Sequence, residues 1–332
     1  MNIINHSKNA DKLSIFYLNG NRNWGKKLSL FSIMKFFFLI VFLLASFTLY
    51  TQTYCQPANS MKILKQKIEN ILSKEKGVFA VAFKDISSGR ELLINPQEEF
   101  HAASTMKTPV MIEVFKQVAE GKLSLKDSFL VRNQFKSIVD SSFYSLDSAG
   151  DSESEIYRHI GEKRTLYNLM YEMIIASSNL STNLVIEIVD PKNVTQTMRE
   201  MGAKKIKVLR GVEDDKAYEA ALNNTTTAYD LMLIFEQIAK GKAVDKKSSD
   251  EMIRILAQQE HNNIIPAELP KDVKVAHKTG WITGVQHDSG IVILPDGRKY
   301  VLVLLSKNLQ DETSAIKAMA HVSRMVYDFV TR

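Results

Sequence analysis

The order of two kinds of hydrophobic pattern along the chain constrains its fold more than any other feature. Segments with the apolar residues and bounding turns of β-strands occur near the start and near the end of the sequence. The segments between them repeat their apolar residues every three or four positions, as helices do. The predicted strands cover residues 78–86, 91–94, 275–282, 290–294 and 299–305. This order predicts an α/β protein of the α+β kind: an antiparallel sheet formed by both chain ends and flanked by helices, with an all-helical subdomain inserted.

Helices and a polar excursion set approximate limits for these parts. A predicted helix at residues 61–74 precedes the first strand, and another, at about 311–330, follows the last. Residues 133–162 are rich in Ser and Asp, which predicts a surface loop or irregular excursion. A crevice between the sheet and the helical part is the expected place for a site. The expected limits are 60–103 and 265–332 for the sheet part and 104–264 for the helical part.

The leader, residues 1–55, combines positive charge with an apolar run. Lys35 directly precedes residues 36–50, an uncharged stretch of 15 residues, whereas a membrane-spanning helix needs roughly 20. This pattern predicts a secretory signal peptide that starts at Met34, and residues before Met34 are then a misassigned start or an unusually long basic region. We expect residues 56–332 to be exported to the periplasm or secreted. An uncleaved membrane anchor is the alternative.

The charge balance outside the leader excludes a nucleic-acid-binding protein built on a basic face. The whole chain carries a formal charge of +6, but residues 56–332 hold 37 basic and 36 acidic side chains, a net +1. The only cysteine, Cys55, precedes this part, so we expect no disulfide and no thiol chemistry in the exported domain. The seven histidines show no spacing typical of a zinc site, and we expect neither a metal nor a cofactor.

Ser104 and Lys107 form an S-x-x-K motif at the start of a strongly apolar helix. Residues three apart lie on the same helix face, so the serine hydroxyl and the lysine amine can meet. If the helix is buried, desolvation lowers the pKa of the amine, which can then act as a base toward the serine. Three further matches occur, at Ser32, Ser73 and Ser314. For a lone match, a capping serine and a surface lysine is therefore the more ordinary explanation.

Two further polar motifs follow in the chain. Residues 177–179, Ser-Ser-Asn, stand between two apolar helical stretches. Residues 278–280, Lys-Thr-Gly, lie within a predicted strand. Each is weak alone, because Ser and Asn between helices are usually caps and Lys-Thr-Gly is usually a solvated strand end. The order and separation of all three motifs are what carry information.

Together the motifs resemble the signature of the penicillin-recognising serine enzymes, and within them of the class A β-lactamases: S-x-x-K, then S-D-N, then K-T-G. The resemblance covers residues 60–332. It extends to Phe-His-Ala-Ala at 100–103, to Asn183, and to Asn-Thr-Thr-Thr at 224–227 before a helix. It implies a domain of the β-lactamase/transpeptidase type.

The resemblance implies catalytic roles for three side chains. Ser104 would be the acylated nucleophile and Lys107 its activating partner. Ser177 would pass a proton to the lactam nitrogen. The oxyanion hole would be formed by the backbone N–H groups of Ser104 and Trp281.

The resemblance also implies a substrate-binding set. Asn179 would hold the side-chain amide of the substrate, while Lys278 and Thr279 would bind its carboxylate as a charge and a hydroxyl donor. Gly280 completes the motif, and Trp281 follows it. The indole of Trp281 would edge the pocket, with simple packing over the sheet as the alternative.

Two departures from the family pattern bear on mechanism. Ser178 replaces the aspartate of S-D-N, where we expect a local rearrangement without loss of acylation. In the omega loop, class A enzymes place a glutamate two residues after an arginine and close the loop with an aspartate. Here Glu213 comes three residues after Arg210, and Asn224 stands at the closing position. Glu213 is the candidate base for the deacylating water, with a solvated loop glutamate as the alternative.

Three functions are compatible with these motifs. The first is a serine β-lactamase that hydrolyses the lactam ring through an acyl-Ser104 intermediate. The second is a D-alanyl-D-alanine peptidase or penicillin-binding protein, which releases its acyl group slowly from a β-lactam; the third is a non-turnover β-lactam sensor domain. Only Glu213 separates the first two, and Asn-Thr-Thr-Thr at 224–227, after a loop of the right size, resembles class A enzymes more than peptidases. We expect a small-molecule β-lactam substrate, no nucleic-acid partner, membrane contact only through the leader, and a monomer.

Overall fold

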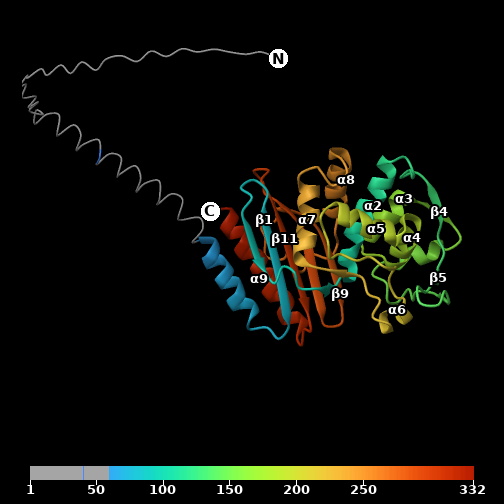
Figure 1. Cartoon of the computed structure of the whole chain (residues 1–332), viewed down its shortest axis with the longest axis horizontal. Helices are drawn as coiled ribbons and strands as arrows, with labels where there is room; N and C mark the ends of the chain where they lie inside the picture. The colour runs from blue at the N-terminus through green and yellow to red at the C-terminus, as the bar shows by residue number, and fades with distance from the viewer. Residues whose placement is uncertain (1–39, 41–59) are drawn as a thin grey trace, which may run out of the picture. The chain divides into compact units, whose positions relative to one another are not determined.

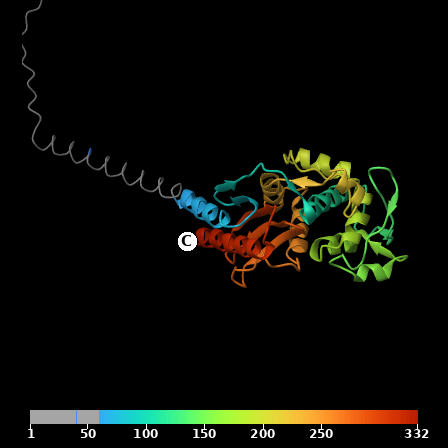
Figure 2. The same ribbon diagram turned by 90° about the horizontal axis from the view of Figure 1, so that it is seen from below.

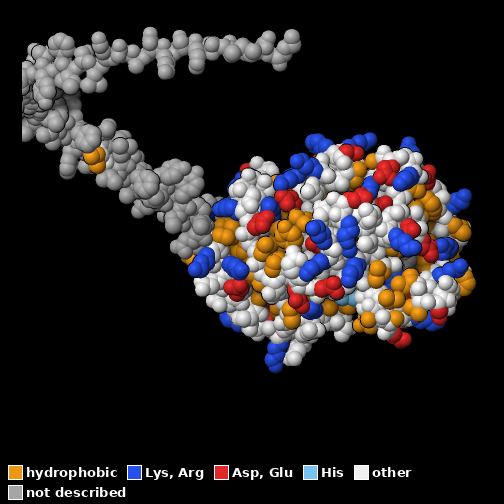
Figure 3. Space-filling view, in the orientation of Figure 1, with side chains coloured by type: hydrophobic (Ala, Val, Ile, Leu, Met, Phe, Trp, Pro, Cys, Tyr) orange, Lys and Arg blue, Asp and Glu red, His pale blue; other side chains and the backbone are white. Residues whose placement is uncertain are grey.

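The computed structural model describes residue 40 and residues 60–332 of the chain. The predicted signal segment at residues 36–50, apart from residue 40, lies outside this part, and so does Cys55. Within the described part, no helix has the length and apolarity to cross a bilayer. Basic and acidic side chains are interspersed over the visible face of the domain (Figure 3), in keeping with the near balance of charge in residues 56–332.

The central element is a five-stranded antiparallel sheet with the order β2-β1-β11-β10-β9. Its strands are β1 (Val78–Asp85), β2 (Glu91–Ile94), β9 (Lys274–Ile282), β10 (Val285–Ile293) and β11 (Lys299–Lys307). β1 pairs with β11 from Val78 opposite Lys307 to Asp85 opposite Tyr300. The predicted sheet made of both chain ends is therefore confirmed.

β10 begins five residues earlier than predicted. Its first half, Val285 followed by Gln286, His287, Asp288 and Ser289, is mostly polar yet buried. These side chains are satisfied by partners from distant segments: His287 Nε2 contacts the His101 carbonyl oxygen at 2.9 Å, and Ser289 Oγ donates to the Lys278 carbonyl oxygen at 3.3 Å. Apolar periodicity cannot reveal a strand whose buried residues are polar.

Helices fill the middle of the chain and cover the sheet. They are α2 (Lys107–Ala119), α3 (Leu166–Ile175), α4 (Asn179–Val189), α5 (Pro191–Glu200), α6 (Asp215–Glu219), α7 (Ala228–Ala239), α8 (Lys246–Leu256) and α9 (Glu312–Val330), with the 3₁₀ turns η1 (Ala103–Met106) and η2 (Glu155–His159). Three two-stranded pairs join them: β3 (Phe100–His101) with β8 (Thr225–Thr226), β4 (Ser128–Leu130) with β7 (Lys163–Thr165), and β5 (Phe135–Lys136) with β6 (Phe143–Tyr144). α2 is buried along nearly its whole length, because it is apolar on most sides.

The two faces of the sheet bury separate cores. Val301 and Val303 of β11 face the helical part, whereas Leu302 packs with helix 60–72 and α9. Figures 1 and 2 show this helix (blue) and α9 (red) side by side. α7, from the middle of the chain, packs on the opposite face against β1, β10 and β11. A strand buried on both faces is apolar throughout, which explains the continuous apolar run in β11.

Candidate active site

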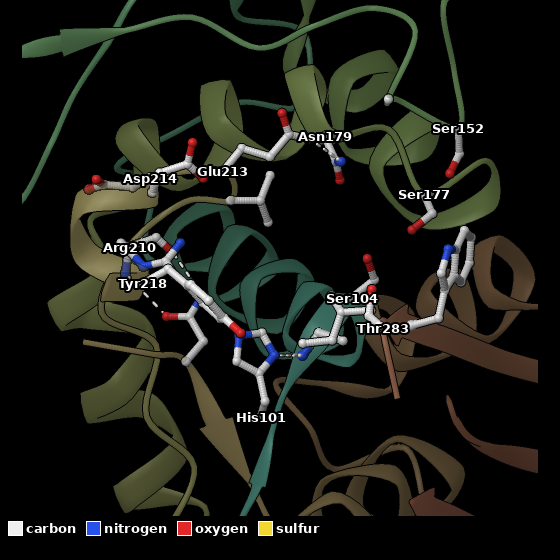
Figure 4. Close-up of a pocket in the computed structure, with 17 residues that line it drawn as sticks. His101, Ser104, Ser152, Ser177, Asn179, Arg210, Glu213, Asp214, Tyr218 and Thr283 are labelled. Atoms are coloured by element: carbon white, nitrogen blue, oxygen red, sulfur yellow. Dashed lines mark hydrogen bonds between the residues drawn. The ribbon is translucent and has the colours of Figure 1, made fainter. Parts of the chain in front are cut away.

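A pocket of about 560 Å³ lies where β9 meets the helical part. Its lining includes Ser104 from η1, Ser177 and Asn179 at the start of α4, Glu213 from the loop before α6, and Trp281 from β9. Figure 4 shows the hydroxyl of Ser104 pointing into this space, with Ser177, Asn179 and Glu213 arranged around it. The structure thus brings residues of the first two motifs, the omega loop and Trp281, which directly follows the third motif, to one cavity.

Ser104 is held at the start of η1, directly before α2. The preceding residue, Ala103, adopts a left-handed backbone with φ of 43°, a strained conformation that is common at functional sites. β9 runs close against this turn, since a Cβ added at Gly280 would lie 2.8 Å from the nitrogen of Ser104 and 2.9 Å from that of Thr105. Only glycine permits this approach, which brings the backbone of Ser104 beside the strand that carries Trp281.

Lys107, the first residue of α2, is fully buried and crosses to the start of α4. Its Nζ donates to the carbonyl oxygen of Ser177 at 2.7 Å, to Ser177 Oγ at 3.1 Å and to Asn179 Oδ1 at 3.1 Å. Burial lowers the pKa of Lys107 to about 7, although the negative charges of Asp151 and Glu213 act in the opposite direction. A large fraction of the amine is therefore neutral near neutral pH and can accept a proton.

Lys278 approaches the same hydroxyl from β9. Its buried Nζ donates to Ser177 Oγ at 3.0 Å and to the carbonyl oxygen of Thr279 at 2.9 Å. Burial holds the pKa of Lys278 well below its usual range, and the nearby charge of Lys107 adds to this effect. Ser177 itself has a left-handed backbone, with φ of 62°. With both acceptor positions of Ser177 Oγ occupied by lysines, its own proton is directed elsewhere.

α4 positions the omega loop through two asparagines one helical turn apart. Asn179 Nδ2 donates to Glu213 Oε1 at 2.7 Å. Asn183 pairs with the backbone of Val212, accepting from its N–H at 2.6 Å and donating to its carbonyl oxygen at 3.0 Å. A Cβ at Gly211 would lie 2.2 Å from Asn183 Oδ1, so this contact requires glycine. These contacts set Glu213 at the pocket even though it is shifted by one residue in sequence.

Glu213 has the surroundings of a base that faces a cavity. Its backbone is left-handed, with φ of 59°, and its carboxylate is partly exposed toward the pocket. Partial burial raises the pKa of Glu213, while the hydrogen bond from Asn179 and the charge of Lys107 lower it.

The omega loop closes without the expected aspartate. Asn224 Oδ1 accepts from the backbone N–H groups of Leu209 and Arg210, at 2.8 and 3.2 Å, and its Nδ2 donates to the Arg210 carbonyl oxygen at 3.0 Å. The Arg210 guanidinium donates to the Leu222 carbonyl oxygen at 3.0 Å and to Asn223 Oδ1 at 3.1 Å. Neutral amides and carbonyls therefore take the place of an Arg–Asp ion pair.

The remaining motif residues belong to β9, and Thr279 lines a second cavity that shares Trp281 with the pocket. Thr279 is buried, and its Oγ1 has no hydrogen-bond partner among residues 60–332, so it is available to a ligand. Trp281 is 41% exposed and lines the pocket, and its ring packs edge-on against His261 with 4.8 Å between centroids. Both interpretations of the Trp281 side chain therefore apply. His277 is buried and contacts Asp288 Oδ1 at 2.8 Å, away from the pocket lining.

Sequence reasoning missed two residues near the pocket. Tyr218 of α6 lies 56% exposed in the lining, and its ring contacts His101 edge-on. Asp151, in the excursion predicted as a surface loop, accepts hydrogen bonds from the first two N–H groups of α4. Tyr218 could have been found as an aromatic residue within the omega loop, but no local signal identifies Asp151.

Comparisons with known proteins agree with this arrangement. The family model described as the beta-lactamase enzyme family matches residues 62–330. The extended-spectrum β-lactamase PER-1 of Pseudomonas aeruginosa is 25% identical over 280 residues, which cover 80% of this chain and 87% of PER-1.

Solved structures show the same architecture. A mutant of PBP-A, in an acyl-enzyme complex with penicillin G, matches with a TM-score of 0.69 and 27% identity over 81% of this chain and 97% of PBP-A. A β-lactamase from Sphaerobacter thermophilus matches with a TM-score of 0.69 and 24% identity over 80% of this chain and 95% of its own. The family model covers nearly all of the described residues, and the chain belongs to the β-lactamase enzyme family.

Proposed function

We propose that this protein is a class A-like serine β-lactamase that opens the β-lactam ring on Ser104 and hydrolyses the acyl-enzyme. One observation carries the proposal: Ser104, Ser177 and Glu213 all line one pocket. The buried amine of Lys107 contacts Ser177 directly and reaches Glu213 through Asn179. A nucleophile, a proton relay and a separate base for water are the three groups that acylation and deacylation need.

In acylation, the neutral amine of Lys107 takes the proton of Ser104, and Ser104 Oγ forms a bond to the lactam carbonyl carbon. The developing oxyanion is stabilised by the N–H groups of Ser104 and Trp281. As the carbon–nitrogen bond breaks, Ser177 gives its proton to the lactam nitrogen and regains one from Lys107, which donates to Ser177 Oγ at 3.1 Å. The proton lost by Ser104 thus reaches the leaving nitrogen, and Lys107 is neutral again.

Substrate binding would use polar groups at and beside the pocket. The unpartnered hydroxyl of Thr279 and the amine of Lys278, as hydrogen-bond donors, suit a carboxylate, whose negative charge would favour the protonated amine. The Asn179 amide suits the side-chain amide of the substrate.

In deacylation, Glu213 would take a proton from a water molecule, whose oxygen attacks the acyl carbonyl carbon. The bond between the acyl carbon and Ser104 Oγ then breaks, the proton taken by Glu213 passes to Ser104 Oγ, and the acid product leaves. The raised pKa of Glu213, caused by partial burial, makes the carboxylate a better base than an ordinary solvated glutamate.

A peptidase or penicillin-binding protein is the second candidate, and the similarity to PBP-A supports it. The two candidates differ in the fate of the acyl group. Purified residues 56–332 should be incubated with a chromogenic cephalosporin and followed by intact mass. Sustained colour change without a lasting adduct supports the β-lactamase, whereas a stable adduct after one turnover supports the penicillin-binding protein or the sensor domain.

We also infer export of a monomeric domain to the periplasm or the medium. Lys35 and the apolar run after it support removal of the leader. N-terminal sequencing of native protein should find a start within residues 47–57, and a start at Met1 would contradict the inference. Size-exclusion chromatography with light scattering tests the monomer.

A further inference from the structure

The start of α4 has two separate caps. The first N–H groups of any helix lack partners within the helix. The hydroxyl of Ser178, in the N-cap position, accepts only from the N–H of Ser181, at 3.1 Å. The N–H of Asn179 instead donates to both carboxylate oxygens of Asp151, at 2.9 Å each, and the N–H of Leu180 donates to Asp151 Oδ2 at 2.9 Å.

Asp151 is itself held in place by its own loop. The hydroxyl of Tyr157 donates to Asp151 Oδ2 at 2.9 Å, and the N–H of Glu153 donates to Oδ1 at 3.1 Å. Burial raises the pKa of Tyr157, and the charge of Asp151 contributes, so this hydroxyl keeps its proton. The neighbouring Ser152 lines the pocket (Figure 4). The carboxylate is therefore fixed between a pocket wall and the helix.

Asp151 holds the backbone of Asn179, the residue that links Lys107 to Glu213. Asn179 contacts Lys107 through Oδ1 and Glu213 through Nδ2, so its orientation sets two catalytic contacts at once. A negative carboxylate at a helix N-terminus also interacts favourably with the helix dipole. Related enzymes have an aspartate in this motif at the place of Ser178, a position from which a carboxylate can cap the same helix.

We propose that Asp151 is a positioning residue that replaces, from a separate loop, the carboxylate missing at Ser178, and that it holds Asn179 in the orientation needed for acylation. Asp151 touches no reacting atom: it acts through Asn179, and its charge also raises the pKa of Lys107. This inference rests on the proposed function, because its effect is measured on acylation of Ser104.

The test compares the acylation rate constant of Ser104 in Asp151→Asn and in the control Asp147→Asn, measured by stopped flow with a chromogenic cephalosporin. Asp147 is exposed in the same loop, and its carboxylate accepts only from the nearby Ala149 N–H. Loss of a charge-assisted hydrogen bond predicts a decrease of about 10- to 100-fold for Asp151→Asn, against less than about twofold for the control. Equal rates in Asp151→Asn and the parent would overturn the proposal.

Rescue distinguishes positioning from general damage. Adding Ser178→Asp to Asp151→Asn should restore the acylation rate at least about threefold, whereas Ser178→Asp in the parent should give no gain, because two carboxylates would then compete for one helix start. No rescue in a double variant with the parent's circular dichroism would count against the proposal. A parent that never acylates would instead refute the proposed function.

A milder variant covers the case in which Asp151→Asn fails to fold. Tyr157→Phe removes one donor to Asp151 and leaves the carboxylate present. Hydrogen exchange of the Asn179 and Leu180 amides should then accelerate relative to the parent, together with a smaller decrease in acylation. Unchanged exchange at both amides would contradict the role assigned to Asp151.

Discussion

Replacement of Glu213 by Gln should separate the two chemical steps. Gln keeps an oxygen that can accept the hydrogen bond from Asn179, which is 2.7 Å long in the parent, so the loop retains its main anchor. Gln and Glu have the same branching, so the substitution adds no strain to the left-handed backbone at this position. What is lost is the ability to take a proton from water.

The expected decrease in the deacylation rate follows from the loss of this base alone. Removing a general base costs about 10² to 10⁴ in rate, which corresponds to about 3–5 kcal/mol in the barrier of deacylation. Acylation should persist, since Ser104 is unchanged and Lys107 keeps its contact with Ser177. Rapid turnover should become a burst followed by a slow phase, and intact mass should show a lasting increment on Ser104.

The structure selects the proper control for this experiment. Asp214 is buried, caps α6 and accepts from the N–H of Ile138 at 3.0 Å, so its replacement should disturb the loop itself. Asp215 is exposed in the first turn of α6, and Asp215→Asn should turn over like the parent. If Glu213→Gln also turns over like the parent, the base has been misassigned. If the parent itself retains the adduct, the protein is a penicillin-binding protein or sensor domain.

Three further predictions concern acylation. A labelled penicillin should attach to Ser104, as shown by peptide mapping. Ser104→Ala should abolish this attachment, and Lys107→Ala should slow it by orders of magnitude. An adduct on another serine would contradict the assignment. Because Lys107 must be neutral and its pKa is lowered to about 7, the acylation rate should rise with pH through about 7 and be about 100-fold below its plateau at pH 5. A flat profile between pH 5 and 8 would exclude Lys107 as the base. Gly280→Ala should destabilise the fold by about 1–3 kcal/mol and slow acylation, since the added Cβ would meet backbone atoms 2.8 Å away; unchanged thermal unfolding would show that η1 moves freely.

Much of the fold could be predicted because its apolar patterns are local. β2 is observed at residues 91–94 as predicted, and α9 begins after its capping residue Asp311. The first half of β10 could not be predicted, because His287 and Asp288 are buried through contacts with His101, 186 positions away in the chain, and with His277 on the neighbouring strand β9. Side-chain partners of this kind are a property of the folded chain.

The same distinction between local patterns and contacts of the folded chain applies to the candidate site. The motif residues could be found because their order and spacing are visible in the sequence, and the one-residue shift of Glu213 is absorbed by contacts from Asn179 and Asn183. Asp151 could not be found. Its surroundings, rich in Ser and Asp, look like a solvated loop, and its contacts with the N–H groups of α4 arise only when the chain folds.

The pairing of β1 with β11 has a consequence for how the chain must fold. The two strands are more than two hundred positions apart, and β9 and β10 attach to the sheet only through β11. During synthesis, the hairpin of β1 and β2 therefore emerges long before the strand that completes it, and most of the sheet forms only after β11 has left the ribosome. Such non-local pairing slows folding. A chain truncated before Lys299 would keep the helices between β2 and β9 but would lose β11 and α9. The apolar edge of β1 would then be unpaired, so the chain should aggregate instead of forming a smaller stable domain.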